Sequence, residues 1–323
     1  MLAAYVNGAD VEQPLQALVV GPVDPPPVPA DWVEVEVRAA ALNHHDVWSL
    51  RGVGLTADQL PMILGCDASG ITADGREVII YPVVNDPSFA GADTTIDPGR
   101  SLLSERYPGT MAERVRVPAG NVIDKPAELS FAEAACLPTA WLTAYRMLFV
   151  QSGLRPGDRV LIQGAGGGVA TALIMLARQA GMWVWVTSRD AGRGERAVAL
   201  GAHRAFPSGA RLPERVDAVM ETVGAATWSH SINALRPGGT VVIAGTTSGA
   251  EPAKAELTKI FFRPLRVIGS TMGTRDELAA LVRMLVATGL RPVIDRVLPL
   301  AEARSAFAAM IDGDVFGKII LEP

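Results

Sequence analysis

Cysteine is scarce in this sequence, which contains only two in 323 residues, Cys66 and Cys136. Two thiols cannot form a four-cysteine zinc site, and in a cytoplasmic protein we expect both to be reduced. Long apolar runs are also missing, so no segment reaches the length needed to cross a bilayer. The first residues, 1–6, have neither the basic start nor the long apolar core of a signal peptide. These absences predict a cytoplasmic protein with no membrane partner.

An excess of positive charge is absent as well. The net charge is −5 at pH 7, whereas a nucleic-acid partner would favour a basic surface. Apolar residues make up 49% of the chain and charged residues 20%, as in ordinary globular proteins. A chain of 323 residues is longer than one hydrophobic core usually accommodates. We therefore expect two domains and no nucleic-acid partner.

The most informative stretch is a glycine-rich turn after a short apolar run, Val160–Ile162. Four glycines occupy five positions from Gly164 to Gly168, and a helical pattern then runs from Val169 to Ala180. Strand, glycine turn and helix are the parts that hold a pyrophosphate against helix N-terminal amides. The match to G-x-G-x-x-G/A is loose, because Ala165 stands at the first glycine, and such loops are often merely turns. The flanking strand and helix favour a dinucleotide site.

The next predicted strand, Trp183–Val186, is followed by Thr187, where an NAD-binding protein would favour Asp or Glu. Ser188, Arg189 and Arg193 come next, and arginine suits a 2′-phosphate, which it can bind through two charge-assisted hydrogen bonds. The alternative is a solvated loop in which two arginines face water. The position after the second strand of a βαβ unit favours NADPH over NADH.

The chain changes character near Pro126. Residues 1–125 are predicted to be β-rich, because apolar and charged residues alternate in Trp32–Ala39. Residues 85–107 have no periodicity, so we expect a long loop that is either functional or mobile. From Val160 strands and helices alternate, as in a doubly wound sheet. We predict a β-rich domain at 1–125 and 272–323, connecting helices at 126–140, and a Rossmann domain at 141–271. Further predicted elements are strands at 77–82, 114–117, 216–221, 240–245, 265–270 and 317–321, and helices from the capping box at Ser130, from Pro138 and at 277–288.

Several segments besides the glycine turn carry a family pattern. They are Ala41–Trp48, Ile63–Asp67, Gly109–Glu113, Leu137–Tyr145, Leu200–Ala202, Leu235–Gly239, Ile268–Thr274 and Phe316–Lys318. Together they resemble the medium-chain dehydrogenase/reductase superfamily in its zinc-free, quinone oxidoreductase-like branch. The similarity runs in order through nearly the whole chain and implies a GroES-like catalytic domain, a Rossmann domain and an active site in the cleft between them.

The departures from the family pattern concern zinc. Zinc-dependent relatives have a cysteine, a histidine and a second cysteine where the resemblance places Asn43, Cys66 and Thr139, and amide and hydroxyl oxygens are poor zinc ligands. The adjacent His44 and His45 would point to opposite faces of an extended segment. The loop at 85–107 lacks the four cysteines of a structural site. We predict no metal ion.

The resemblance also implies a mechanism. Without a metal to polarise a carbonyl, hydride from NADPH suits acceptors that delocalise the charge, such as quinones and α,β-unsaturated carbonyls. The residues placed near the nicotinamide are Asn43, Asp46 and Trp48, and Tyr81 is a possible proton donor. The alternatives are a turn residue for Asn43, a helix cap for Asp46, and structural core positions for Trp48 and Tyr81.

Other residues are assigned to NADP(H). Lys318 matches a family position that reaches the pyrophosphate, with an exposed strand-end lysine as the alternative. The remaining predicted cofactor contacts are Thr143, Gly166, Gly167, Gly168, Val169, Ala170, Ser188, Arg189, Arg193, Val223, Gly224, Ala244, Gly245, Thr246, Met272 and Gly273.

Two rival functions stay open: a zinc-dependent alcohol dehydrogenase, and an NADPH-binding sensor or structural protein without turnover. By analogy with relatives, Arg266–Ile268 would pair with a second copy at the sheet edge to make a homodimer.

Overall fold

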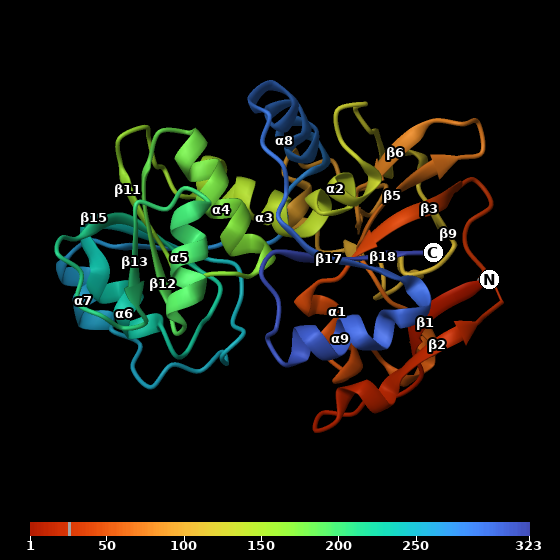
Figure 1. The fold of residues 1–323 in the computed structure, drawn as a ribbon, viewed down its shortest axis with the longest axis horizontal. Coiled ribbons are helices and arrows are strands. Elements are labelled where there is room, and N and C mark those ends of the chain that lie inside the picture. Colours follow the sequence, from red (N-terminus) through yellow and green to blue (C-terminus); the bar gives the residue numbers. More distant parts are fainter. Residues whose placement is uncertain (25–26) are drawn as a thin grey trace. The chain divides into compact units, whose positions relative to one another are not determined.

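The computed structural model describes residues 1–24 and 27–323. The described chain divides into two compact units, 1–139 with 274–323, and 140–273 (Figure 1). The first unit therefore contains both ends of the sequence, and its chain is interrupted by the whole of the second.

A seven-stranded sheet forms the centre of the first unit. Val35 and Val37 are buried and Glu36 and Arg38 exposed, so the predicted alternation is confirmed. The last strand pairs antiparallel with the third, which places Ile320 opposite Ala41. The strands are β3 (Val33–Ala41), β5 (Asp67–Thr72), β6 (Glu77–Ile80), β9 (Arg114–Val117), β10 (Val122–Asp124), β17 (Ile294–Pro299) and β18 (Lys318–Glu322). Their order in the sheet is β10-β6-β5-β3-β18-β17, and β9 also pairs with β3.

Two small sheets and several helices complete the first unit. The predicted capping box is present at α2, where Ser130 and Glu133 each hydrogen-bond the backbone amide of the other. The small-sheet strands are β1 (Leu2–Val6), β2 (Leu18–Pro22), β4 (Met62–Ile63), β7 (Val83–Val84) and β8 (Ser101–Leu102). The helices include α1 (His44–Leu50), α2 (Phe131–Ala135), α8 (Arg275–Thr288) and α9 (Ala303–Ile311).

The segment at His44 and His45 is not extended as predicted. Helix α1 begins at His44 because the Asp46 carboxylate accepts the backbone N–H of Asn43 at 2.8 Å, which is half of a capping box. The opposite-face prediction for the two histidines is therefore wrong, since consecutive helical residues are only about 100° apart around the axis.

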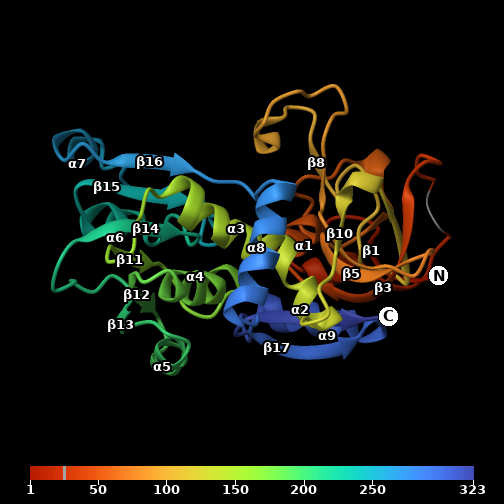
Figure 2. The same cartoon turned by 90° about the horizontal axis from the view of Figure 1, so that it is seen from above.

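The long loop at 85–107 is tied together by Asp97, which is 1% exposed. Its carboxylate accepts hydrogen bonds from the backbone N–H groups of Asp86 and Gly99, both at 2.7 Å, and from the Asn85 amide at 3.2 Å. Burial opposes ionisation, but these hydrogen bonds outweigh it and lower the pKa of Asp97. Figure 2 shows the loop standing out beside β8. It therefore has an internal hydrogen-bonded framework.

The second unit is a doubly wound parallel sheet of six strands in the order β13-β12-β11-β14-β15-β16. This order has two halves that meet at β11 and β14, the switch point where such folds bind ligands. Val160, Leu161 and Ile162 are at most 1% exposed, as predicted for a strand buried on both faces. The strands are β11 (Arg159–Ile162), β12 (Trp183–Ser188), β13 (Arg204–Pro207), β14 (Val216–Glu221), β15 (Leu235–Ile243) and β16 (Arg266–Gly269).

Helices flank this sheet. Helix α4 packs on β11 and β12, and α6 packs on β14 and β15 (Figure 1). The helix predicted from Pro138 is present, but it contains wider π turns at Leu137–Trp141 and Arg146–Gln151. The α-helices are α3 (Leu142–Tyr145), α4 (Gly168–Gln179), α5 (Ala191–Ala199), α6 (Trp228–Ala234) and α7 (Leu257–Phe262).

Strand β16 lies at the edge of the second unit's sheet. Val267 on this strand is 43% exposed, and Phe261 and Phe262 on α7 are 65% and 73% exposed. The pairing of two copies across this edge stays a prediction. None of the helices formed by residues 1–24 and 27–323 has the length and apolar character of a membrane span.

Candidate functional site

The glycine turn lies between β11 and α4. Gly164 and Gly166 have φ of 78° and 109°, a region that favours glycine. Gly167 is the N-cap of the 12-residue helix α4 and provides no side chain to cap its first amides. A Cβ added at Gly167 would meet no heavy atom within 4 Å. The helix start is therefore open to an anion, and its residues fit the pyrophosphate of a dinucleotide.

Thr187 is bound to this turn. Its hydroxyl donates to Gln163 Oε1 at 2.7 Å and accepts the N–H of Gly164 at 3.2 Å. The side chain is buried at the position where a carboxylate would favour NAD. Thr187 therefore stabilises the glycine turn instead of presenting an acceptor to a ribose.

The predicted phosphate-binding side chains follow at the carboxyl end of β12. The Ser188 hydroxyl donates to the Asp190 carbonyl at 2.7 Å, and Asp190 caps α5 by accepting the Arg193 N–H at 2.7 Å. Arg189 is exposed and Arg193 is half-buried. Arg189 directly follows β12 and is the more exposed of the two arginines.

Glu221, at the end of β14, is a residue that the sequence interpretation missed. It is fully buried, and its Oε1 accepts the backbone N–H groups of Val223 and Gly224 at 2.8 and 3.0 Å. Thr227, the N-cap of α6, and Ser231 within α6 also donate to this carboxylate, at 2.9 and 2.5 Å. A carboxylate at the end of a predicted strand, two residues before the predicted cofactor contact Val223, was the available signal. Glu221 fixes the turn that carries two predicted cofactor contacts.

The other predicted cofactor residues are distributed unevenly. Those of 166–170, 188–189, 223–224 and 244–246 follow or lie near the ends of β11, β12, β14 and β15, four neighbouring strands of one parallel sheet. Their shared edge is the carboxyl edge, where doubly wound folds bind ligands. Thr143 lies instead in α3, and Met272 and Gly273 end the second unit. Lys318 belongs to the first unit.

Lys318 is not exposed, so the strand-end alternative is wrong: its side chain is 3% exposed. The ammonium donates to Asn43 Oδ1 at 2.6 Å, the Leu42 carbonyl at 2.8 Å and Asp67 Oδ2 at 3.3 Å. These three bonds use all three of its protons. Contact with a pyrophosphate would require the ammonium to leave them.

Asp67 is the acceptor at the centre of the same cluster. It is fully buried and also accepts the Asn43 amide at 2.9 Å and the Thr139 hydroxyl at 2.5 Å. Burial raises the pKa of Asp67, and the Lys318 charge and these hydrogen bonds oppose the rise. We call Lys318, Asp67, Asn43 and Thr139 the lysine cluster.

The lysine cluster does not fit the zinc ion that the zinc-dependent members of the predicted family bind. Of the three positions that correspond to zinc ligands, Asn43 and Thr139 donate to Asp67. The third, Cys66, donates its thiol to the Leu103 carbonyl at 3.3 Å instead. The cluster already contains an ammonium, and its amide and hydroxyl oxygens are weak ligands beside thiolate and imidazole.

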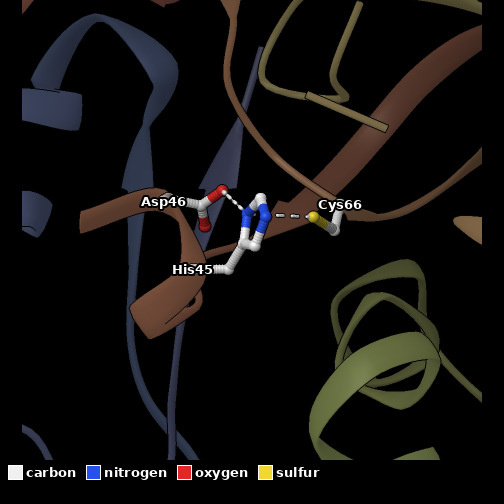
Figure 3. Close-up of side chains that lie close together, drawn as sticks. All are labelled: His45, Asp46 and Cys66. Atoms are coloured by element: carbon white, nitrogen blue, oxygen red, sulfur yellow. Dashed lines mark hydrogen bonds and ion pairs between the residues drawn. The ribbon is translucent and has the colours of Figure 1, made fainter. Parts of the chain in front are cut away.

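Cys66 belongs to a second group at the start of α1, shown in Figure 3. Its Sγ lies 3.5 Å from His45 Nδ1, and His45 Nε2 lies 3.1 Å from Glu105 Oε1. Negative charge at Cys66 would raise the pKa of His45, as do hydrogen bonds to Asp46 and Glu105, whereas burial opposes the rise. Burial raises the pKa of the Cys66 thiol. The sequence did not predict that these residues lie together.

The remaining predicted catalytic residues are held by structural contacts. Asp46 is fully buried, and its other oxygen accepts the Gly65 N–H at 3.1 Å. Trp48 is half-buried, with the Arg51 guanidinium 5.1 Å from its ring centroid. Tyr81 is 2% exposed, and its carbonyl accepts the Asn121 amide at 2.8 Å. Asp46 thus has the helix-capping role that was its alternative in the sequence. The catalytic roles of Asp46, Trp48 and Tyr81 stay predictions.

Comparison with known proteins identifies the family. Residues 29–127 match the alcohol dehydrogenase GroES-like domain, and residues 168–287 match the zinc-binding dehydrogenase family. A crystal structure of an NAD-dependent alcohol dehydrogenase is 33% identical, with a TM-score of 0.92 and 100% of both chains covered. The chain belongs to the medium-chain dehydrogenase/reductase superfamily. The predicted fold class, a GroES-like domain plus a Rossmann domain, is confirmed.

Other members of the superfamily are reductases. Crotonyl-CoA carboxylase/reductase from Cereibacter sphaeroides is 27% identical over 92% of this chain and 81% of its own length. The structure of crotonyl-CoA carboxylase/reductase AntE in complex with NADP is 26% identical, with a TM-score of 0.91, and covers 100% of this chain and 94% of that one. The protein is therefore an oxidoreductase of the medium-chain dehydrogenase/reductase type.

Proposed function

We propose that this protein uses NADPH to reduce quinones or α,β-unsaturated carbonyl compounds by hydride transfer, with no zinc ion in the catalytic step. The observation that carries the proposal is the lysine cluster. At the positions where zinc-dependent relatives hold their ion, the side chains of Asn43 and Thr139 are bound to Asp67, and Lys318 supplies the positive charge.

NADPH is supported by the edge of the parallel sheet. The open start of α4 suits a pyrophosphate, and the exposed Arg189 suits a 2′-phosphate. Thr187 replaces the carboxylate that would accept from a ribose hydroxyl. The AntE complex contains NADP, whereas the 33% identical alcohol dehydrogenase is NAD-dependent, so the cofactor is decided by the residues after β12. We take Arg189 as the deciding residue.

The substrate class follows from the chemistry of the lysine cluster, whose amide, hydroxyl and ammonium groups do not fit a zinc ion. A simple carbonyl needs an electrophile to stabilise the developing alkoxide. A conjugated acceptor delocalises the charge, so binding and orientation contribute a larger part of catalysis. Crotonyl-CoA, named in two relatives, is an α,β-unsaturated thioester of this kind.

The polar residues at the start of α1 act here as positioning residues. The Asn43 amide is bound to Asp67 and Lys318, and both Asp46 oxygens accept backbone N–H groups. Their hydrogen bonds fix the helix that carries Trp48, which we propose as an apolar wall beside the nicotinamide. A proton for the reduced product comes from water.

The test of this function is NADPH consumption by chelator-treated full-length protein with a panel of quinones, enones and simple aldehydes. We expect turnover with the conjugated acceptors and not with the aldehydes, and no loss after metal removal. Activity that disappears on chelation and returns with stoichiometric zinc would establish the alcohol dehydrogenase instead. Tight NADPH binding without consumption of any acceptor would establish the sensor.

Replacing Arg189 with alanine should weaken NADPH binding by roughly 10- to 100-fold, because a charge-assisted bond of about 1.5–3 kcal/mol is lost. NADH binding should change by no more than about twofold, since NADH lacks the 2′-phosphate. Equilibrium fluorescence titration with both cofactors measures the two constants. Arg211, exposed in the same unit, is the matched control, and Arg211→Ala should alter neither. Equal losses for both cofactors in Arg189→Ala would contradict the phosphate pocket.

A further inference from the structure

We propose that His45, Asp46 and Cys66 form a binding site for a divalent ion of the zinc class. Their ligand atoms, His45 Nδ1, an Asp46 carboxylate oxygen and Cys66 Sγ, all lie within 4.8 Å of one another (Figure 3). The set combines an imidazole, a carboxylate and a thiol, the three ligand types that zinc takes from proteins.

The distances suit a tetrahedral ion. Metal–ligand bonds of about 2.0–2.3 Å at tetrahedral angles place ligand atoms roughly 3.3–3.6 Å apart. His45 Nδ1 is 3.5 Å from Cys66 Sγ and 4.0 Å from Asp46 Oδ1. The imidazole–thiol pair is thus already at ligand spacing. The carboxylate lies within 4.8 Å of the other two ligand atoms and has to approach by up to about 1 Å. Three protein ligands leave a fourth position for water.

The surroundings hold the ligands in place. Glu105 binds His45 Nε2 at 3.1 Å, the outer carboxylate that commonly orients a metal-bound histidine and leaves its other nitrogen for the ion. Asp46 is fixed by backbone N–H groups of Asn43 at 2.8 Å and Gly65 at 3.1 Å. Each of its oxygens accepts one such bond, so each retains a lone pair. The start of α1 and the segment before β5 therefore hold all three ligands near one position.

This site is separate from the one that zinc-dependent relatives use. Its ligands do not include Asn43 or Thr139, whose side chains are bound to Asp67 in the lysine cluster. It shares only Cys66 with the family positions. On binding, the Cys66 S–H bond breaks and metal–sulfur and metal–nitrogen bonds form; the thiol proton goes to the buffer, together with the Nδ1 proton of any His45 that is charged. The ion would fasten the first turn of α1 to the chain at Cys66.

Cobalt(II) is the probe, because a cobalt–thiolate bond gives a near-ultraviolet charge-transfer band. Titration of chelator-treated full-length protein should give this band with one ion per chain. Cys66→Ser and His45→Gln should abolish the band, and Glu105→Gln should weaken binding by roughly 10- to 100-fold. Cys136→Ser, which removes the chain's other thiol, and Thr139→Ala should leave the band and its midpoint unchanged.

Absence of the band in the unaltered protein would overturn the site, as would its persistence in Cys66→Ser. Loss of the band in Thr139→Ala would also overturn it, by moving the ion to the family position. The proposal is independent of the proposed function, and the two can fail separately. NADPH consumption by metal-free protein decides the function, and the cobalt band decides the site.

Discussion

Lys318→Met will lower the free energy of unfolding by roughly 3–5 kcal/mol, the usual effect of removing one partner of a buried ion pair. The substitution retains most of the apolar stem but leaves the Asp67 carboxylate fully buried without its ammonium. Asn43 Oδ1 and the Leu42 carbonyl lose their donor as well. The cost comes from the uncompensated charge more than from lost packing.

Urea denaturation followed by tryptophan fluorescence measures this loss. Lys259→Met is the matched control, because Lys259 is 42% exposed in its pair with Glu256. Solvent therefore screens this pair more than the Lys318–Asp67 pair, and its loss should cost about 1 kcal/mol or less. Combining Lys318→Met with Asp67→Asn should recover much of the loss, since the buried charge then disappears from both sides. A loss no larger than that of Lys259→Met, or no recovery in the double variant, would show that the lysine cluster does not behave as a buried pair.

The sequence predicted what depends on local pattern. The glycine turn at 164–168, the alternation around Val35 and the capping box at Ser130 each lie within a few residues, where periodicity and capping rules act. The resemblance then ordered these pieces into two domains. Helix α1 is a local element that was not predicted: the segment at His44 and His45 was expected to be extended. The helix cap formed by Asp46 was only the alternative interpretation of that residue.

Long-range side-chain contacts could not be predicted in this way. Lys318 reaches Asn43 and Asp67, which lie 275 and 251 positions earlier. His45 meets Glu105 and Cys66 across 60 and 21 positions. No spacing rule brings such residues together, because the antiparallel pairing of β18 with β3 and the course of the 85–107 loop decide the contacts. These residues give no clear signal as ligands in the sequence, and they form a cluster only in the folded first unit.

Gly167→Val will weaken NADPH binding by roughly 100-fold, about 2.7 kcal/mol, while the free protein stays folded. Gly167 has φ −71° and ψ 161°, which valine adopts without strain. A Cβ at this position meets no protein atom within 4 Å, so the new side chain enters the space in front of α4. That space is where a pyrophosphate must approach the helix amides.

Fluorescence titration with NADPH and NADH measures the effect, and we expect equal losses because both cofactors share the pyrophosphate. This separates Gly167→Val from Arg189→Ala, for which only NADPH binding should fall. Gly21→Val is the control, since Gly21 in β2 also has no neighbour within 4 Å of an added Cβ. Stability of Gly167→Val should change by no more than about 1 kcal/mol, the range of N-cap substitutions. Unchanged affinity in this variant would place the cofactor away from the glycine turn, and the assignment of the carboxyl edge of the parallel sheet would then fail with it.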